Sequence, residues 1–438
     1  MTGTDRQTAT TKTSARWTGR LALPLAAVFI LSAFIGVHAT AARGANAPAV
    51  IRIGVLVTLQ GPFAVDGQDG IRGVQMAIRE FGGKVAGKQI KLVIEGTDAS
   101  VNTARDKVRK LIEQDGAQIE IGPLSGDEGL YGVKPYARTH PGITFVNGTS
   151  AADDTTVRAP VKNFYRFSTD GTQWMAGLGD YVYKVRGYRR MAVVAEDYSF
   201  PYSQVAGFMV PFCRDGGHVV HKSWVPIGTT DYSSVVTQIP RNVDAIYVDL
   251  GGADSIDFLK AYSQFGGKAP IVGGTVTVDQ TVLSTKGTLQ GRVLGVDSAG
   301  PQADNDPSAA WQSFVRAYRK AYPAALNIPS LFATDYYIAA KAAMLALRQV
   351  HGNLGGGEAA FQRALARVAF NTPTGPVRLD QNRNAIANEF INEVAKTGNG
   401  TLYNKLVRVV PNVNETLGLP RAQYLRYGEF NRNNPNCP

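Results

Sequence analysis

The sequence predicts an α/β protein in which two doubly wound parallel sheets form two lobes. From Ile51 onward, one order repeats: a short β-branched run, a loop with glycine or serine, then a segment with helical spacing of apolar residues. Strands that alternate with helices favour parallel sheets covered on both faces. The strand series also breaks off and begins again, which indicates two similar lobes joined by several linkers.

Eight strands are expected, four in each series. The first series is expected at 51–57, 91–96, 118–123 and 143–148, and the second at 191–197, 218–224, 245–252 and 270–275. Segment 103–116 is a typical intervening helix, because its apolar residues share one face and its charges the other. Ligands of such open sheets sit at the carboxyl ends of the strands, so the loops that follow the strands are candidates for a site.

The chain is expected to cross between the lobes more than once. Residues 165–171 interrupt the strand rhythm, the second series ends near 297–307, and 372–384 marks another crossing. The resulting division places 48–168 and 300–376 in lobe 1, and 169–299 and 377–438 in lobe 2.

Residues 1–41 are interpreted as a cleavable secretory signal. A basic, threonine-rich start precedes the apolar run Leu21–Val37, and Ala39-Thr40-Ala41 is a small-x-small cleavage site. The alternative is a retained membrane anchor, but Pro24 and the short run argue against a spanning helix. The mature protein is therefore expected to be soluble and exported to the periplasm.

Charge and cysteines narrow the function classes. The formal charge is +11, but it is scattered without a basic run or an aromatic-interleaved patch, so nucleic-acid binding has little support. Cys213 and Cys437 can pair in an exported protein or remain two free thiols, and the sequence leaves both open. The five histidines do not cluster near either cysteine, so no metal site is expected.

The sequence also lacks the common catalytic and cofactor motifs. It has no Gly-x-Ser-x-Gly, no Walker-type loop, no His-Glu-x-x-His and no Gly-x-Gly-x-x-Gly closing a strand. A Ser-His-Asp triad assembled from distant segments is a weak alternative. The protein is therefore expected to be neither an enzyme nor a cofactor carrier.

Two loops after expected strands favour an anion. In GPLSGDEG, Ser125 and Glu128 form a capping-box pattern, and a glycine-lined helix start also offers free backbone N–H groups to an anion. In FVNGTSAADDTT, the turn at 148–150 could serve a nucleophilic serine, a phosphate or a smaller anion, or could be a plain turn. Because Asp153 and Asp154 would repel a doubly charged phosphate, a single carboxylate is the better guest.

Several motifs, in order, resemble one family. IRIGVLVTLQGPFAVDGQDGIRGVQMAI (51–78), the IGPLSG and VNGTSA turns, and YVDLGGADSIDFLKAYSQFG (247–266) are similar to the periplasmic solute-binding proteins of branched-chain amino-acid ABC importers. The resemblance runs from about Ile51 to about Asn384. It implies the type I periplasmic binding protein fold, with three crossover hinges between lobes that close on a small ligand. It further implies a monomer that delivers the ligand to an ABC permease in the inner membrane.

The resemblance also implies a set of ligand contacts from loops that follow the strands. The carried-over positions are Asp66, Ser125, Gly126, Gly148, Ser150, Phe200, Tyr202, Gly251 and Thr275. The residues themselves add Thr149, whose hydroxyl can donate beside that of Ser150, and Tyr198, which directly follows an expected strand. The serines and the nearby amides would hold a carboxylate, so Ser150→Ala is expected to weaken binding by roughly ten-fold or more. Two positions depart from the family, which often has serine at Gly126 and has glutamate at Thr275 to pair an α-ammonium group.

The departure at Thr275 sets the ligand hypothesis. A desolvated ammonium without an anionic partner is costly, so the site either recruits another acid or prefers ligands without the amine. The acids near the expected cleft loops are Asp66, Glu196, Asp197, Asp249 and Asp279. The sequence hypothesis is that small aromatic carboxylates bind more tightly than leucine, isoleucine or valine, with amino acids or amides as alternatives. A ligand-sensing receptor of the same fold, without a transport role, is the alternative function.

Overall fold

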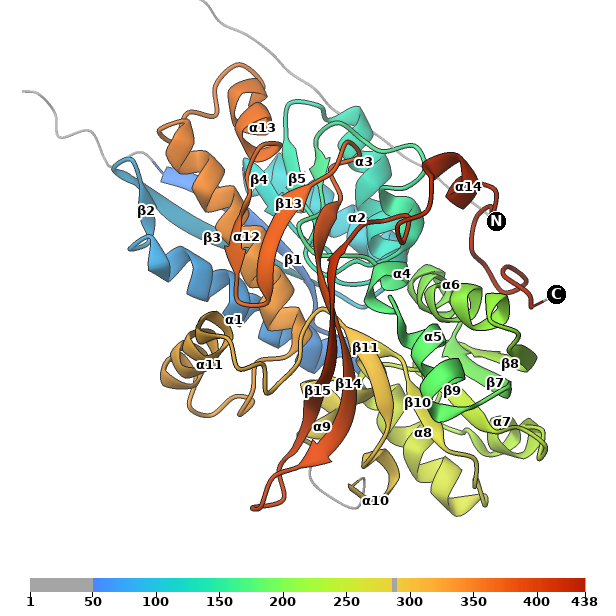
Figure 1. Ribbon diagram of the computed structural model, residues 1–438. Coiled ribbons are helices and arrows are strands. Elements are labelled where there is room, and N and C mark those ends of the chain that lie inside the picture. Colours follow the sequence, from blue (N-terminus) through green and yellow to red (C-terminus); the bar gives the residue numbers. More distant parts are fainter. Residues whose placement is uncertain (1–49, 286–289, 438) are drawn as a thin grey trace, which may run out of the picture. The chain divides into compact units, whose positions relative to one another are not determined.

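The first sheet contains all four strands expected in the first series (Figure 1). The computed structural model describes residues 50–285 and 290–437, so the expected signal segment 1–41 lies outside the described residues and its cleavage stays a prediction. The sheet order is β2-β3-β1-β4-β5-β6. Its strands are β1 (Val50–Thr58), β2 (Lys84–Val85), β3 (Lys88–Thr97), β4 (Ile119–Ile121), β5 (Thr144–Val146) and β6 (Phe164–Tyr165).

Parallel pairing brings the carboxyl ends of these strands to one edge. Ile53 of β1 lies opposite Leu92 of β3 on one side and opposite Ile119 of β4 on the other. Both faces of β1 are buried over most of its length, as expected for a strand covered by helices on both sides. The helices of this lobe are α1 (Ala64–Glu80), α2 (Val101–Arg109), α3 (Lys134–Thr139), α11 (Ala309–Ala321), α12 (Leu331–Gln349) and α13 (Ala359–Leu365).

The second sheet contains the other four expected strands in its central and edge positions. Its order is β12-β13-β14-β11-β10-β9-β7-β8, and β15 pairs with β14. The strands are β7 (Arg190–Glu196), β8 (His218–Val225), β9 (Ala245–Asp249), β10 (Ile271–Gly273), β11 (Asp297–Gly300), β12 (Phe370–Thr372), β13 (Gly375–Leu379), β14 (Ala385–Lys396) and β15 (Leu402–Val413).

Short and long helices accompany this second sheet. They are α4 (Gly171–Trp174), α5 (Leu178–Tyr181), α6 (Ser199–Arg214), α7 (Ser233–Gln238), α8 (Gly252–Gln264), α9 (Gln280–Leu283) and α10 (Gln290–Val293), followed near the C-terminus by α14 (Arg421–Leu425). The two-lobe α/β fold predicted from the sequence is therefore confirmed. The long β14–β15 hairpin and α14 were not expected, because they follow the segment in which strand and helix alternate.

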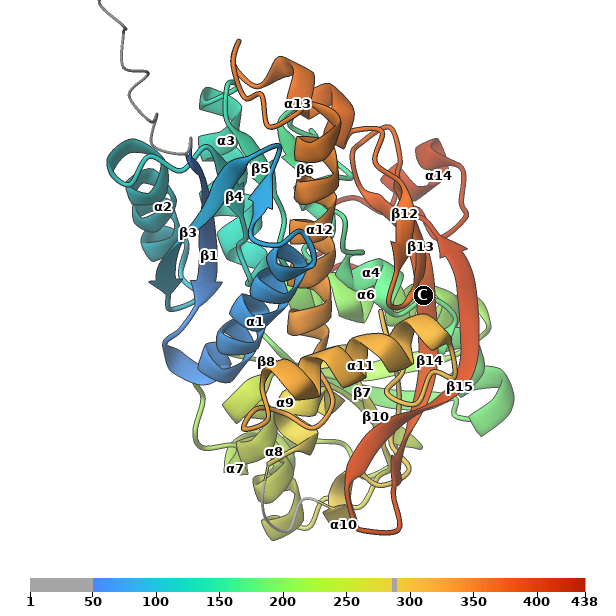
Figure 2. The same cartoon turned by 90° about the vertical axis from the view of Figure 1, so that its left-hand side faces the viewer.

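Helix α1 is held close to β1 and α12 by glycines (Figure 2). A Cβ on Gly67 would lie 1.8 Å from the Thr58 carbonyl oxygen, and one on Gly73 would lie 2.0 Å from the Ala333 carbonyl oxygen of α12. Any side chain at either position would push α1 away from β1 or from α12. This packing positions the first turn of α1, and with it Asp66, at the carboxyl end of β1.

The chain passes between the sheets after β6, after β11 and again around β13 and β14. At the last crossing, β12 and β13 extend the second sheet, yet Val377 packs in the apolar core that includes β1 and α12. The strand pairing and the core thus divide this segment differently. The expected lobe boundary at 376/377 falls inside β13 and stays a prediction.

Cys213 and Cys437 form a disulfide, with 5.3 Å between their Cα atoms. The sequence had left this pairing open. Among residues 50–285 and 290–437, no helix combines the length and the apolar character that a membrane crossing requires.

Candidate functional site

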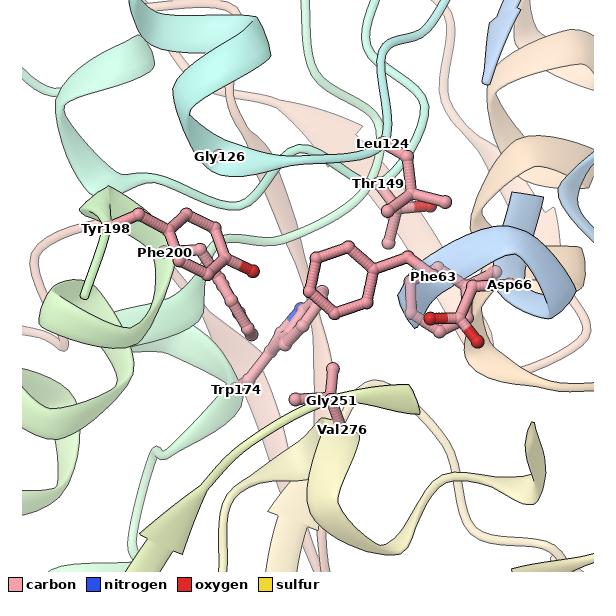
Figure 3. A pocket seen from close by; sticks show the side chains of 11 residues that line it. Phe63, Asp66, Leu124, Gly126, Thr149, Trp174, Tyr198, Phe200, Gly251 and Val276 are labelled. Atoms are coloured by element: carbon pink, nitrogen blue, oxygen red, sulfur yellow. The ribbon is translucent and has the colours of Figure 1, made fainter. Parts of the chain in front are cut away.

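A small cavity lies between the lobes, where the carboxyl ends of strands from both sheets meet (Figure 3). Its volume is about 20 Å³, which is room for about one water molecule, so a larger ligand requires the lobes or the lining side chains to move apart. The first lobe supplies Phe63, Asp66, Leu124, Gly126, Thr149 and Phe332, and the second supplies Trp174, Tyr198, Phe200, Gly251 and Val276.

The lobes touch around this cavity. The Ser199 amide donates to Asp127 Oδ1 at 3.0 Å, and the Leu331 amide donates to Asp279 Oδ2 at 3.0 Å. A Cβ on Gly252 would lie only 2.2 Å from the Pro62 carbonyl oxygen, and Gly252 has φ +49°. Gly252 is therefore required both for its backbone conformation and for this close approach between the lobes.

The first-lobe side of the cavity carries polar atoms without protein partners. Asp66 Oδ1 and Thr149 Oγ1 are buried and accept or donate no hydrogen bond within the described part of the chain. The Gly126 amide stands at the start of the helical segment 126–139, where the first N–H groups of a helix have no acceptor within it. Because unpaired buried polar groups are costly, these three groups are the candidates for hydrogen bonds to a ligand.

Two amides that the sequence favoured for an anion are already used. The backbone amides of Thr149 and Ser150 both donate to the Pro123 carbonyl oxygen, at 3.1 and 3.2 Å. The turn at 148–150 is thus tied to the neighbouring GPLSG loop. Thr149 lines the cavity and its hydroxyl is buried without a partner in the described part of the chain, but its amide is not available to a ligand.

Acidic groups surround the cavity, while its lining contains no lysine, arginine or histidine. Burial raises the pKa of Asp66 well above its usual range, and the nearby Asp279 carboxylate raises it further. Burial also raises the pKa of Glu196 and of Asp249, which stand at the ends of β7 and β9. Glu196 Oε1 accepts from the Gly251 amide at 3.0 Å, whereas both Asp249 oxygens lack partners among the described residues.

Aromatic rings form the second-lobe side. The Trp174 and Phe200 rings meet edge to face, with centroids 5.4 Å apart, and Tyr198 lies 6.0 Å from Phe200. Across the cavity, the Phe63 ring of the first lobe lies 6.5 Å from that of Tyr198. Figure 3 shows the Tyr198 hydroxyl pointing toward the centre of this group of rings. The arrangement suits a flat apolar group between the lobes.

The structure explains why position 126 is a glycine, which the sequence alone did not. A Cβ at this position would lie 2.8 Å from Phe200 Cβ and 2.9 Å from Ser199 Oγ. A serine, which the resemblance leads one to expect here, would therefore clash with the aromatic side in the closed arrangement. The glycine and Phe200 form a matched pair across the cleft.

Six of the eleven predicted contacts line the cavity: Asp66, Gly126, Thr149, Tyr198, Phe200 and Gly251. Three others belong to the turns beside it. A Cβ on Gly148 would lie 2.3 Å from the Tyr336 ring, so this glycine makes room for α12. The Ser150 hydroxyl lies 3.5 Å from the Gly126 carbonyl oxygen, and the Ser125 amide donates to Glu128 Oε2 at 3.0 Å, which is half of the expected capping box.

Tyr202 and Thr275 also lie outside the lining. The Tyr202 hydroxyl donates to Asp197, and its ring meets the Trp224 ring edge to face at 4.9 Å. Thr275 Oγ1 donates to the Ala299 carbonyl oxygen at 2.7 Å and accepts from Gln204 Nε2 at 2.6 Å. Both hydroxyls are thus engaged within the protein. Direct ligand contact by any of the predicted residues stays a prediction.

Sequence reasoning missed the other lining residues: Phe63, Leu124, Trp174, Val276 and Phe332. Three of them are neighbours of quoted motifs, since Phe63 lies in GPFAV, Leu124 in GPLSG and Val276 next to Thr275. Trp174 follows the first crossing, and Phe332 begins a helix far along the chain. No local pattern distinguishes these last two from core residues.

Metal binding has no support in the part of the chain that the structure describes. No group of three or more His, Cys, Asp or Glu side chains there could hold a metal ion.

Known proteins match both the chain and its fold. A family model described as periplasmic binding protein matches residues 50–399. The chain belongs to this family. Leu/Ile/Val-binding protein homolog 6 of Brucella melitensis is 26% identical to this periplasmic binding protein, over 85% of this chain and 95% of its own length.

Solved structures agree with the family. An ABC transporter substrate-binding protein from Sphaerobacter thermophilus is 28% identical, with a TM-score of 0.74 over 83% of this chain and 99% of its own. A solute-binding protein of an ABC transporter from R. palustris, in complex with benzoate, is 23% identical, with a TM-score of 0.75 over 83% of this chain and 97% of its own. This binding protein is therefore of the leucine/isoleucine/valine-binding type that serves ABC transporters.

Proposed function

We propose that this binding protein captures a small amino acid with a flat apolar side chain in the periplasm and delivers it to an ABC permease. The observation that supports this proposal most directly is the cavity itself. Polar groups and a carboxylate oxygen without hydrogen-bond partners among the described residues lie there beside a set of aromatic rings. The Gly126 amide and the Thr149 hydroxyl would bind the ligand carboxylate, with the helix start adding favourable electrostatics. Asp66 would pair with the ammonium group, replacing the glutamate that is absent at Thr275.

Charge balance supports a ligand with an amine. A purely anionic ligand would enter a cavity with an acid and no base in its lining. An ammonium group would instead stabilise the ionised form of Asp66, whose buried charge has no basic partner among the lining residues. The rings would stack on a side chain of similar shape, at about 0.5 to 1.5 kcal/mol per pair beyond area burial.

A small aromatic carboxylate without an amine is the second candidate. The raised pKa of Asp66 favours it, because a protonated Asp66 could donate a hydrogen bond to a ligand carboxylate. The benzoate bound by the R. palustris protein shows that the fold accommodates such ligands. The choice between the candidates therefore depends on the charge state of Asp66.

Thermal-shift measurements on the mature protein would test the proposal. The panel contains phenylalanine, tyrosine, leucine, benzoate and cinnamate, and mass spectrometry would identify any small molecule that co-purifies. We expect the largest stabilisation from phenylalanine or tyrosine. Stabilisation by benzoate or cinnamate alone would favour the second candidate, and stabilisation by none of the five would contradict both.

Delivery to a permease has its own test. Uptake of the identified ligand into cells should require this binding protein together with an ABC permease and its ATPase. Uptake that is unchanged when the binding protein is deleted would instead favour a sensing receptor.

A further inference from the structure

The last residues of the chain form a separate feature, which we call the C-terminal strap (residues 414–437). The strap lies beyond the segment that matches the family model, which ends at residue 399. It follows β15, includes α14, and runs beside α6 to the edge of the second sheet (Figure 1). Its end is bonded to α6 through Cys437 and Cys213.

The end of the strap covers the edge strand β8. The Trp224 indole nitrogen donates to the Arg432 carbonyl oxygen at 3.2 Å, and Lys222 Nζ donates to the Pro435 carbonyl oxygen at 3.1 Å. The Val219 amide lies 3.3 Å from Cys437 Sγ. These contacts and the disulfide hold the strap along β8 over much of its length.

The strap also contacts the loop that carries the aromatic side of the cavity. Arg432 Nε donates to Asp197 Oδ1 at 2.6 Å, and its Nη2 donates to the other oxygen of the same carboxylate. Asp197 directly precedes Tyr198 in the connection from β7 to α6. The same carboxylate accepts from Tyr202, whose ring packs on Trp224. Bidentate pairing of this kind fixes orientation as well as distance.

Other strap residues reach the first lobe. The Tyr424 hydroxyl donates to Asp153 Oδ1 at 3.2 Å, and the Tyr131 hydroxyl donates to Glu429 Oε1 at 3.3 Å. Tyr424 and Phe430 also share an apolar cluster with Val157 of the first lobe. The strap therefore connects the loop at Asp197 with the lobe that forms the opposite side of the cavity.

We infer that the strap positions the aromatic side of the binding cavity, and that Arg432 is a positioning residue for Tyr198 and Phe200. Arg432 does not line the cavity, so it acts through Asp197 and the backbone that follows. This role of Arg432 concerns the position of the aromatic side, and it does not depend on which ligand the cavity binds. Without the ion pair, the start of α6 would lose one of the contacts that fix it, beside the Asp197 amide bond to the Val225 carbonyl oxygen of β8 at 2.8 Å and the Ser199 amide bond to Asp127.

Hydrogen exchange of the ligand-free protein tests this inference. In Arg432→Ala, we expect amides of 198–206 to exchange at least about five-fold faster, while those of β1 stay as in the wild type. The matched control is Arg426→Ala, because Arg426 is an exposed arginine of the same strap whose side chain has no partner among the described residues. Arg432→Lys keeps the positive charge but cannot make the bidentate pair with Asp197. Its exchange rates for 198–206 should therefore lie between those of Arg432→Ala and Arg426→Ala.

A second variant allows the inference to be tested even if Arg432→Ala folds poorly. Cys213→Ser/Cys437→Ser frees the strap end without touching Asp197, and it should also speed exchange in 198–206. Unchanged exchange there in both variants, or an equal increase in Arg426→Ala, would overturn the inference. Binding of phenylalanine to the wild type is measured in parallel, so a wrong ligand assignment would show there and leave the exchange result interpretable.

Discussion

The two sides of the cavity differ in chemistry although similar α/β lobes build them. The first-lobe side has polar groups without partners among the described residues, on Asp66, Thr149 and the start of the helical segment at Gly126. The second-lobe side has the rings of Trp174, Tyr198 and Phe200. We expect the polar groups to recognise the charge of a ligand, and the rings to recognise its shape and exclude water. On this hypothesis, the first lobe selects the ligand class and the second lobe contributes to closure.

This difference also predicts an order of events. In an open form, the first-lobe groups can hold the charged end of a ligand by themselves. Closure then brings Phe200 against Gly126 and removes the ligand from water, which strengthens the electrostatic contacts already made. The following variants break one side at a time.

The largest effect is expected from Asp66→Asn. If Asp66 pairs with an ammonium group, the variant leaves a buried charge without its partner, at about 2 to 5 kcal/mol. Affinity for phenylalanine should then fall on the order of thirty-fold or more by calorimetry. Benzoate serves as the internal control, since it has no ammonium to lose. Equal losses for both compounds would contradict the assignment of Asp66.

The pH dependence of affinity should differ between the two ligand classes. Because the pKa of Asp66 is raised in the free protein, this group must release a proton before it can pair with an ammonium. Affinity for phenylalanine should therefore rise as pH increases from about 4, the ordinary aspartate value, toward the raised pKa. The slope has a limit of about ten-fold per pH unit.

Benzoate should behave differently. It binds best to protonated Asp66, so its affinity should stay level at pH values below the raised pKa and fall as the pH increases through it. Calorimetry at several pH values measures both slopes. A fall in phenylalanine affinity over this range would contradict the proposed ion pair.

Gly126→Ala tests the contact between the two sides. Its added Cβ would lie 2.8 Å from Phe200 Cβ, so the closed form is disfavoured while each lobe stays intact. We expect about ten-fold weaker binding, and small-angle scattering should show less contraction on ligand addition than in the wild type. Gly142→Ala is the control, because its added Cβ meets only the Gly357 Cα at 3.6 Å. Normal contraction in Gly126→Ala would show that this contact does not limit closure.

The fold could be predicted largely from the sequence, because its information is local and repeated. Runs such as IRIGVLV and MAVVAED are apolar enough to be buried on both faces, and each became a parallel strand. Site positions next to a strand end, such as Thr149 and Phe200, could be found for the same reason. Trp174 and Phe332 could not, because a ring in the lining has the same local pattern as a ring in the core.

Other features depend on contacts between distant residues. The close approach of Gly126 to Phe200 joins two loops from different lobes, and the strap pairs Arg432 with Asp197 across 235 positions. Neither the residue types nor their spacing in the sequence predicts such a contact. The sequence also could not distinguish the roles of Thr149 and Ser150. Thr149 belongs to the cavity lining, whereas the Ser150 hydroxyl contacts the neighbouring loop at Gly126.

Substitutions of Thr149 and Ser150 should have the smallest effects on affinity, and the expected effect of Ser150→Ala is smaller than the sequence predicted. Thr149 lines the cavity, and its buried hydroxyl has no partner among the described residues, whereas the Ser150 hydroxyl faces the Gly126 carbonyl oxygen at 3.5 Å, a weak contact. Thr149→Val keeps the shape and removes one hydrogen bond to the ligand, so we expect about five-fold weaker binding. Ser150→Ala should change affinity by less than about two-fold, instead of the ten-fold that the sequence resemblance implied. Calorimetry on both variants decides the order, and a larger loss in Ser150→Ala would mean that the turn at 148–150 presents its serine to the ligand when the lobes are open.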